Sequence, residues 1–114
     1  MQTLYNELER MKNDLNASMR QLRKNGEILA HKEHDYQVIK AQTVLKMKDA
    51  GCSMTEINLA IKGQPEVAKA LLERDIAKTM YDANLEHINV VKLELRVIEN
   101  QISREWNNGA TQNV

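Results

Sequence analysis

The sequence predicts an all-α fold, in which two long helices form an antiparallel hairpin with a short capped helix at its tip. Two observations lead to this prediction. The 114 residues include only one Pro and four Gly, below the usual shares of about 5% and about 7%, so few positions force regular structure to break. Apolar residues in both halves of the chain also recur at spacings of three, four and seven, which is the period of an α-helix.

The first predicted helix extends from about Gln2 to Asp49. Its middle contains Asn25-Gly26, a dipeptide typical of a turn. A turn would normally reset the phase of the apolar pattern, yet four residues keep a spacing of seven across the glycine: Leu15, Leu22, Leu29 and Tyr36. We therefore expect a continuous helix with a soft spot at Gly26.

Stop and start signals place the remaining elements. Gly51 can take the left-handed conformation that closes a helix, and residues 53–56 (SMTE) match a capping box that opens a short helix over about 53–62. Pro65 suits the first turn of a last helix, which we expect to reach about Trp106. Residues 1–106 then form one helical domain, and the polar residues 107–114 form a flexible tail.

The last predicted helix carries two apolar stripes, which is more apolar surface than one facing helix covers. We expect the first stripe to form an oligomer core: Ile88, Val91, Leu95, Ile98 and Ile102. The second stripe includes Leu72, Ile76, Met80, Ala83, Val90, Leu93 and Val97. An antiparallel homodimer forming a four-helix bundle along part of its length, or a higher homo-oligomer, would cover both stripes.

Charge is balanced over the whole chain and unbalanced along it. Sixteen Lys and Arg equal sixteen Asp and Glu, which argues against binding to nucleic acid or an anionic membrane through bulk electrostatics. Residues 1–48 carry nine basic and six acidic side chains, and residues 49–114 carry seven and ten. Opposite charges favour the first helix lying against the last, although a solvated surface with a chance imbalance explains the same numbers.

No targeting or membrane segment is predicted. The opening residues, MQTLYNELERMK, lack the basic start and apolar run of a signal peptide, and no stretch is apolar for long enough to span a bilayer. The single cysteine, Cys52, cannot form an internal disulfide and is expected to lie half-buried in a turn. We therefore expect a cytoplasmic protein, in the host cell if the chain is encoded by a phage.

Two patterns suggest nucleic-acid contact. The short helix, the turn at Gly63 and the helix at Pro65 have the rhythm of a helix-turn-helix, which would present Gln64, Glu66, Lys69, Ala70 and Glu73 to a major groove. The first 24 residues also form the most basic stretch of the chain. The candidate contact residues are Arg10, Lys12, Arg20, Arg23, Lys24, Lys62 and Lys69, but the usual interpretations are a solvated helix face and the end of a hairpin.

No cofactor, metal or catalytic site is predicted. Glu27, His31 and Asp35 share a helix face, with His34 beside them, but the Glu-x-x-His pairs of helical di-metal sites are absent, and we expect surface pairs instead. There is no phosphate-binding Gly-rich loop, nucleophile elbow or paired-cysteine motif. We therefore expect a protein that is not an enzyme.

A set of short motifs covers nearly the whole chain apart from the tail. They are residues 22–26 (LRKNG), 34–36 (HDY), 48–51 (KDAG), 62–63 (KG), 74–77 (RDIA) with Tyr81, and 93–106 (LELRVIENQISREW). Together they resemble a family of small helical proteins encoded by phages of Gram-positive bacteria. The resemblance implies a setting near genes for recombination and replication. It implies no activity and supplies no functional residues.

These observations lead to two functional hypotheses. The first is a non-enzymatic phage accessory protein that acts during infection by oligomerisation and by binding an unidentified host or phage protein. It would serve DNA recombination and replication, or it would inhibit a host enzyme or defence system. Its candidate interaction residues are Ile57, Leu59, Ile61 and Trp106, because apolar side chains left uncovered by a hairpin suit a partner. The alternative is a nucleic-acid or nucleotide binder that uses the basic residues named above.

Overall fold

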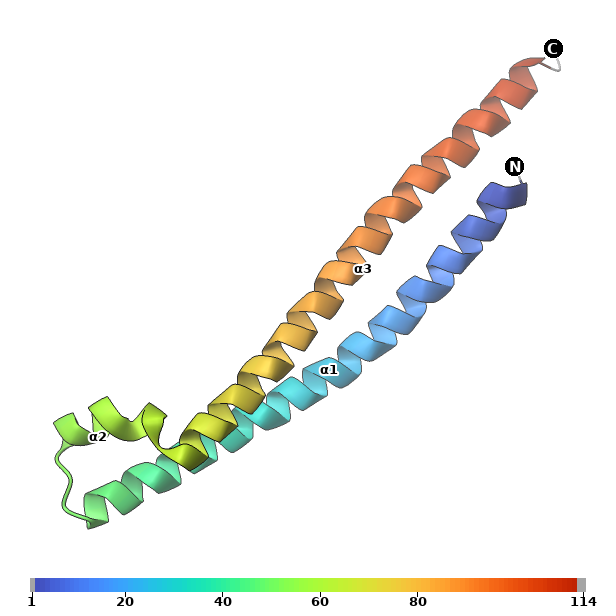
Figure 1. Ribbon diagram of the computed structural model, residues 1–114. Coiled ribbons are helices and arrows are strands. Elements are labelled where there is room, and N and C mark those ends of the chain that lie inside the picture. Colours follow the sequence, from blue (N-terminus) through green and yellow to red (C-terminus); the bar gives the residue numbers. More distant parts are fainter. Residues whose placement is uncertain (1, 113–114) are drawn as a thin grey trace. The chain divides into compact units, whose positions relative to one another are not determined.

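The computed structural model describes residues 2–112, and the side chains of residues 2–109, as an all-helical chain (Figure 1). Its elements in order are α1 (Gln2–Asp49), α2 (Met54–Ala60), the short 3₁₀ helix η1 (Ile61–Gly63) and α3 (Pro65–Gln112). α1 and α3 run antiparallel, with α2 and η1 in the connection between them. The predicted helical hairpin with a short helix at its tip is confirmed.

The chain divides into two compact units. We call Lys24–Asp82 the tip unit; it holds the end of α1, all of α2 and η1, and the start of α3. In the terminal unit, the part of α1 that ends at Arg23 packs with the part of α3 that begins at Ala83. Each unit has its own buried residues.

α1 continues through Asn25 and Gly26, as the unbroken spacing of its apolar residues predicts. Gly26 lies inside the helix, and a Cβ at this position would stand 3.5 Å from Cε2 of Tyr81 on α3. The glycine therefore lies close to the facing helix without breaking its own. Packing of the apolar face outweighs the helix propensity that a glycine loses, which is about 1 kcal/mol.

The C-terminus of α1 is closed by Gly51. Its φ of 91° is the only positive value among residues 2–112. Two backbone hydrogen bonds complete a Schellman motif: the Cys52 amide donates to the Met47 carbonyl at 3.0 Å, and the Gly51 amide donates to the Lys48 carbonyl at 3.0 Å. Cys52 is half-buried next to the core of the tip unit, as predicted for a residue in a turn.

The connection between the long helices is helical and partly buried. The Ser53 hydroxyl accepts a hydrogen bond from the Glu56 amide at 3.2 Å, so Ser53 caps α2 as predicted. The short helix then tightens into η1, a change of hydrogen-bond pattern that the sequence did not predict. Gln64 is extended, with ψ of 131°, because a residue before proline is excluded from the helical region.

The core of the tip unit joins all of its elements. Five buried residues form it: Tyr36 from α1, Ile57 from α2, Ile61 from η1, and Val67 and Ala70 from α3. Ile57 and Val67 are nearly inaccessible to solvent. Burial of this cluster fixes the short helix against both long ones, since each fully buried aliphatic side chain contributes roughly 1.5–3 kcal/mol.

The seam of the terminal unit consists of the first predicted stripe. Ile88, Val91, Leu95 and Ile98 are buried within a single chain, and Ile102 is half-buried. Only the α1 segment of the same unit is available to cover them. These residues therefore have little surface left for a second chain, which corrects the expectation that they form an oligomer core.

α3 ends later than predicted. It reaches Gln112 instead of stopping near Trp106, because residues 107–112 contain one glycine and no proline, and a single glycine does not end a helix that is already formed. Of the predicted flexible tail, residues 113 and 114 lie outside the described residues. Among residues 2–112, no helix is long and apolar enough to cross a membrane.

Candidate interaction surfaces

The terminal unit exposes an apolar face on α3. Val90, Leu93 and Val97 follow one another at spacings of three and four, so they share one side of the helix. Val90 follows the buried Ile88 by two positions, which places it roughly 200° around the helix from that residue. Leu93 and Val97 each keep 59% of their surface exposed. We call these three residues the terminal apolar patch.

The tip unit exposes a second apolar face on α3. Leu72, Ile76 and Met80 are spaced by four residues, and each keeps more than half of its surface exposed. Leu72 follows the buried Ala70 by two positions, so it also lies away from the seam. We call these three residues the tip apolar patch. Both patches come from the second predicted stripe, and the prediction that one facing helix leaves it uncovered is confirmed.

The structure separates the four predicted protein-interaction residues into two classes. Ile57 and Ile61 belong to the core of the tip unit, so they are not available to a partner, and their predicted role is corrected. Their spacing of four matches a surface stripe as well as a core stripe, which is why the sequence did not distinguish the two. Leu59 and Trp106 are 84% and 68% exposed, so both remain candidates.

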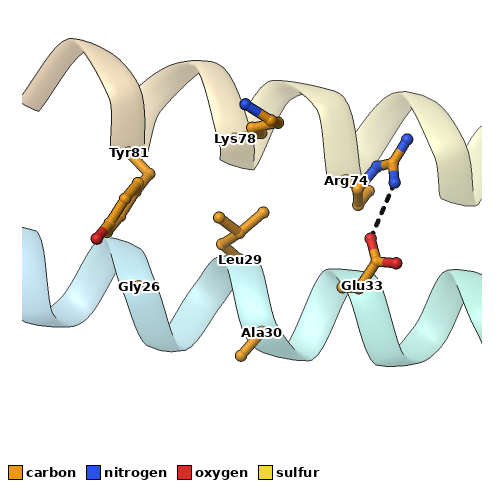
Figure 2. Close-up of a pocket in the computed structure, with 7 residues that line it drawn as sticks. All are labelled: Gly26, Leu29, Ala30, Glu33, Arg74, Lys78 and Tyr81. Atoms are coloured by element: carbon orange, nitrogen blue, oxygen red, sulfur yellow. Dashed lines mark hydrogen bonds and ion pairs between the residues drawn. The ribbon is translucent and has the colours of Figure 1, made fainter.

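A groove crosses the tip unit between α1 and α3 (Figure 2). Its volume is about 520 Å³. Gly26, Leu29 and Ala30 line it from α1, and Tyr81, Lys78 and Arg74 line it from α3. The missing side chain at Gly26 leaves the ring of Tyr81 beside the helix backbone at one end.

An ion pair closes the other end of the groove. Arg74 Nη1 donates to Glu33 Oε2 at 3.0 Å, while Arg74 Nε donates to Asp75 at 3.0 Å. The Arg74 guanidinium also lies 5.1 Å from the centre of the Tyr36 ring, within the range of a cation–π contact. All three nitrogens of the Arg74 guanidinium therefore have a partner within the chain, and the contact with Glu33 joins α3 to α1.

The same pair shifts two pKa values. Hydrogen bonds from Gln37 and then from Arg74 lower the pKa of Glu33 from its ordinary value. The hydrogen bond to Glu33 raises the pKa of Arg74 further. Both shifts favour the charged forms of these two side chains.

Polar side chains interrupt the seam on α1. Ser18, Asn25 and Thr43 are buried at positions that continue the spacing of the apolar residues. Asn84 Nδ2 donates to the Ser18 carbonyl at 3.1 Å, and the Thr43 hydroxyl donates to the Ile39 carbonyl at 2.8 Å. No buried side-chain nitrogen or oxygen lacks a partner among the described residues. Polar residues are not part of an apolar pattern, so the sequence predicts burial of neither Ser18 nor Thr43, and it marks Asn25 only as part of a possible turn.

The predicted nucleic-acid contacts are exposed and divided between the units. Arg10, Lys12, Arg20 and Arg23 lie in the terminal unit; Lys24, Lys62 and Lys69 lie in the tip unit. Arg10 is paired with Glu7.

The helix-turn-helix pattern at the tip is only partly available to a major groove. Ala70, one of its predicted groove-facing residues, is buried in the core. Glu73 accepts a hydrogen bond from Lys32 at 3.2 Å. The start of α3 is therefore used in part for packing within the chain, which corrects the assignment of Ala70 to a reading face.

The polar cluster on α1 stays at the surface. Glu27, His31, His34 and Asp35 are all exposed. Among the residues that the structure describes, no group of three metal-ligating side chains lies close enough to hold an ion.

Comparison with known proteins adds no relative. The chain matches no protein-family model, no curated protein and no solved structure. The functional argument therefore depends on the surfaces themselves.

Proposed function

We propose that this chain is a non-enzymatic interaction protein that works by oligomerisation and by binding another protein. The observation that carries the proposal is the exposed side of α3, where the terminal and tip apolar patches each present three large apolar side chains. Single exposed apolar residues are common on proteins, but runs that keep the helical period along one face mark a surface for another helix. The resemblance noted above would place this activity in a phage-infected cell.

The proposal predicts that substitutions in the patches change assembly and leave the fold intact. Leu93→Lys adds a charge to the terminal apolar patch at an exposed position, so we expect the helical circular dichroism to be unchanged. Sedimentation equilibrium at micromolar concentration should show an oligomer for the native chain and a smaller species for this variant. Leu45→Lys is the matched control, because Leu45 is as exposed as Leu93 but lies on α1, outside both patches. A native chain that remains a monomer and captures no protein that depends on Leu93 would refute the proposal.

A second candidate function is nucleic-acid or nucleotide binding by the terminal unit. It is supported by Lys12, Arg20 and Arg23, which are exposed and form no ion pair with another of residues 2–112. Phosphate binding of this kind weakens steeply as salt rises. Fluorescence anisotropy with a labelled oligonucleotide, measured at two salt concentrations, tests it: absent or salt-independent binding removes this candidate. Arg20→Ala with Arg23→Ala should reduce the salt slope by about two phosphate contacts.

A further inference from the structure

We infer that the tip unit binds an amphipathic helix of a partner protein, whose large apolar side chains enter two hollows on α1 and whose flanking residues are acidic. The inference rests on the proposed function, because it gives the chemistry of a protein partner. It concerns a different surface from the two apolar patches. Ile76 of the tip apolar patch follows Arg74 by two positions, which places it roughly 200° around α3 from that groove residue.

The first hollow is the groove between α1 and α3, and on α1 it has the form of a hole in helix packing (Figure 2). Its α1 residues stand at spacings i, i+3, i+4 and i+7: Gly26, Leu29, Ala30 and Glu33. Four residues at these spacings enclose one gap on the surface of a helix, and such a gap receives a single side chain from a facing helix. The groove therefore has the shape that a third helix requires.

The second hollow lies further along α1 and has a volume of about 420 Å³. Four of its residues repeat the same spacings: Gln37, Lys40, Ala41 and Val44. Each stands eleven residues beyond its counterpart in the groove, which is close to three full turns, so both hollows lie on the same side of α1, about 16.5 Å apart. An amphipathic helix carries apolar side chains at i, i+4, i+7 and i+11. Two of its side chains, eleven residues apart, therefore match the two hollows.

Gly26 keeps the groove open at a cost to its own helix. A glycine within a helix is less favourable than an alanine, and its φ is not positive, since only Gly51 has a positive φ among residues 2–112. A Cβ at position 26 would meet Tyr81 at 3.5 Å, an ordinary contact distance, so the fold accepts alanine. A methyl group would instead take space in the groove beside the Tyr81 ring. A residue that weakens a helix without a gain in packing points to function.

The charges around the hollows favour an acidic helix. Three of the four charged side chains that line them are basic: Lys40, Arg74 and Lys78, against Glu33. Glu33 is already paired with Arg74. Lys78 pairs with Asp82, but both side chains are more than half exposed, and Lys40 forms no ion pair with another of residues 2–109. Acidic residues beside the apolar stripe of a partner helix would meet Lys40 and Lys78.

Two designed helical peptides test the charge of the partner. Both carry fluorescein and the same leucine stripe at i, i+4, i+7 and i+11; one has Glu and the other has Lys beside the stripe. Fluorescence anisotropy with the native chain should show that the acidic peptide binds about 5-fold or more tightly than the basic one. Equal binding of the two, tighter binding of the basic peptide, or no binding of either at about 100 μM overturns the inference.

Filling the hollows tests the site. Gly26→Ala and Ala41→Leu should each weaken binding of the acidic peptide about 5-fold or more, because each occupies space that a leucine of the peptide needs. Gly26→Ala should raise the stability of the chain at the same time, which a merely structural role of the glycine would not produce. Gly63→Ala is the matched control, since it adds the same methyl group outside both hollows. Unchanged affinity in Gly26→Ala or in Ala41→Leu overturns the site, provided that circular dichroism shows native helix content.

A charge reversal tests the contact with Lys40. Lys40→Glu should remove or reverse the preference for the acidic peptide. Lys46→Glu makes the same change on the same helix, six residues later and roughly 120° around it, where the side chain lines neither hollow, so the preference should stay. A preference that Lys40→Glu leaves unchanged overturns the acidic partner.

The α3 patches separate failure of this inference from failure of the proposed function. If Ile76→Lys or Leu93→Lys abolishes binding of the acidic peptide and Gly26→Ala does not, the patches hold the peptide, which overturns the hollows as its site and retains the interaction role. A chain that binds neither peptide, stays a monomer and captures no protein that depends on Leu93 overturns both.

Discussion

Gly51 ends α1 in a conformation that other residues adopt only at a cost. Its φ of 91° places it in the left-handed region, and no atom stands within 4 Å of the position that a Cβ would take. Gly51→Ala therefore introduces backbone strain without a steric clash, and we expect the free energy of unfolding to fall by about 1–2 kcal/mol. Urea denaturation measures the change. Gly63→Ala is the control, because Gly63 also has open space but no positive φ, and it should cost less.

Gly26 should respond in the opposite direction. The new Cβ of Gly26→Ala would meet Tyr81 Cε2 at 3.5 Å, an ordinary van der Waals distance. The substitution removes the entropic cost of a glycine within a helix, so we expect stability to rise by about 0.5–1 kcal/mol. Thermal and urea unfolding of the variant measure this gain. A loss of stability would show that the groove beside Tyr81 cannot accept a methyl group.

Glu33 links the stability of the tip unit to pH. Its pKa is lowered in the folded chain, chiefly by the hydrogen bond from Gln37 and then by Arg74. A carboxylate of this kind stabilises the fold above its unfolded pKa, and the contribution is lost as pH falls through the lower folded pKa. We expect the Glu33 carboxyl to titrate below its ordinary range by NMR, and Gln37→Ala to raise that midpoint. An unchanged midpoint in the variant would contradict the assigned cause.

At the scale of the elements, the boundaries that depend on local chemistry were predicted well. Gly51, Ser53 and Pro65 act within one turn of the chain, through left-handed backbone, a side-chain cap and a fixed φ, so their neighbours suffice to predict their effect. The turn suggested by Asn25-Gly26 is not formed, because the apolar spacing across it has a facing helix to pack against. The facing helix is distant in sequence, so the residues next to Asn25 and Gly26 do not predict this outcome.

The assignment of surfaces was predicted less well for the same reason. Both stripes of α3 have the period of a helix, and periodicity does not say which stripe faces α1 and which faces solvent. The stripe that includes Ile88 and Val91 continues, through Ala77 and Ala70, the spacing of the buried residues nearer the tip. Alanine and the polar seam residues are not large apolar side chains, so the apolar pattern alone does not trace this continuity.

The short helix α2 offers a matched pair of substitutions at this scale. Ile57 is 1% exposed in the core, whereas Leu59, two residues later, is 84% exposed. We expect Ile57→Ala to cost about 2–5 kcal/mol through lost burial and the cavity it leaves, and Leu59→Ala to cost less than about 0.5 kcal/mol. Chemical denaturation compares the two. Similar losses would mean that α2 does not hold the core as described.

At the scale of the whole molecule, zero net charge conceals local pairing that does not follow the halves of the chain. The basic first half and acidic second half predict cations on α1 and anions on α3. The pair of Lys32 on α1 with Glu73 on α3 has this predicted polarity. In two other pairs the acidic residue lies on α1 instead: Glu33 with Arg74, and Asp14 with His87. Individual pairs therefore help to set the register of the helices, while the imbalance remains available at the surface for another molecule.

Self-association through α3 also predicts how stability depends on concentration. If folding is coupled to formation of a closed dimer, mass action stabilises the native state as the protein is concentrated. We expect the midpoint of thermal unfolding to rise by several degrees between about 1 and about 100 μM, since about 1 kcal/mol shifts a domain of this size by roughly 4–8 °C. Leu93→Lys should make the midpoint independent of concentration, and Leu45→Lys should preserve the dependence. A native midpoint that stays constant over this range would show that a single hairpin is stable without a second copy, and that its apolar face is kept for a different protein.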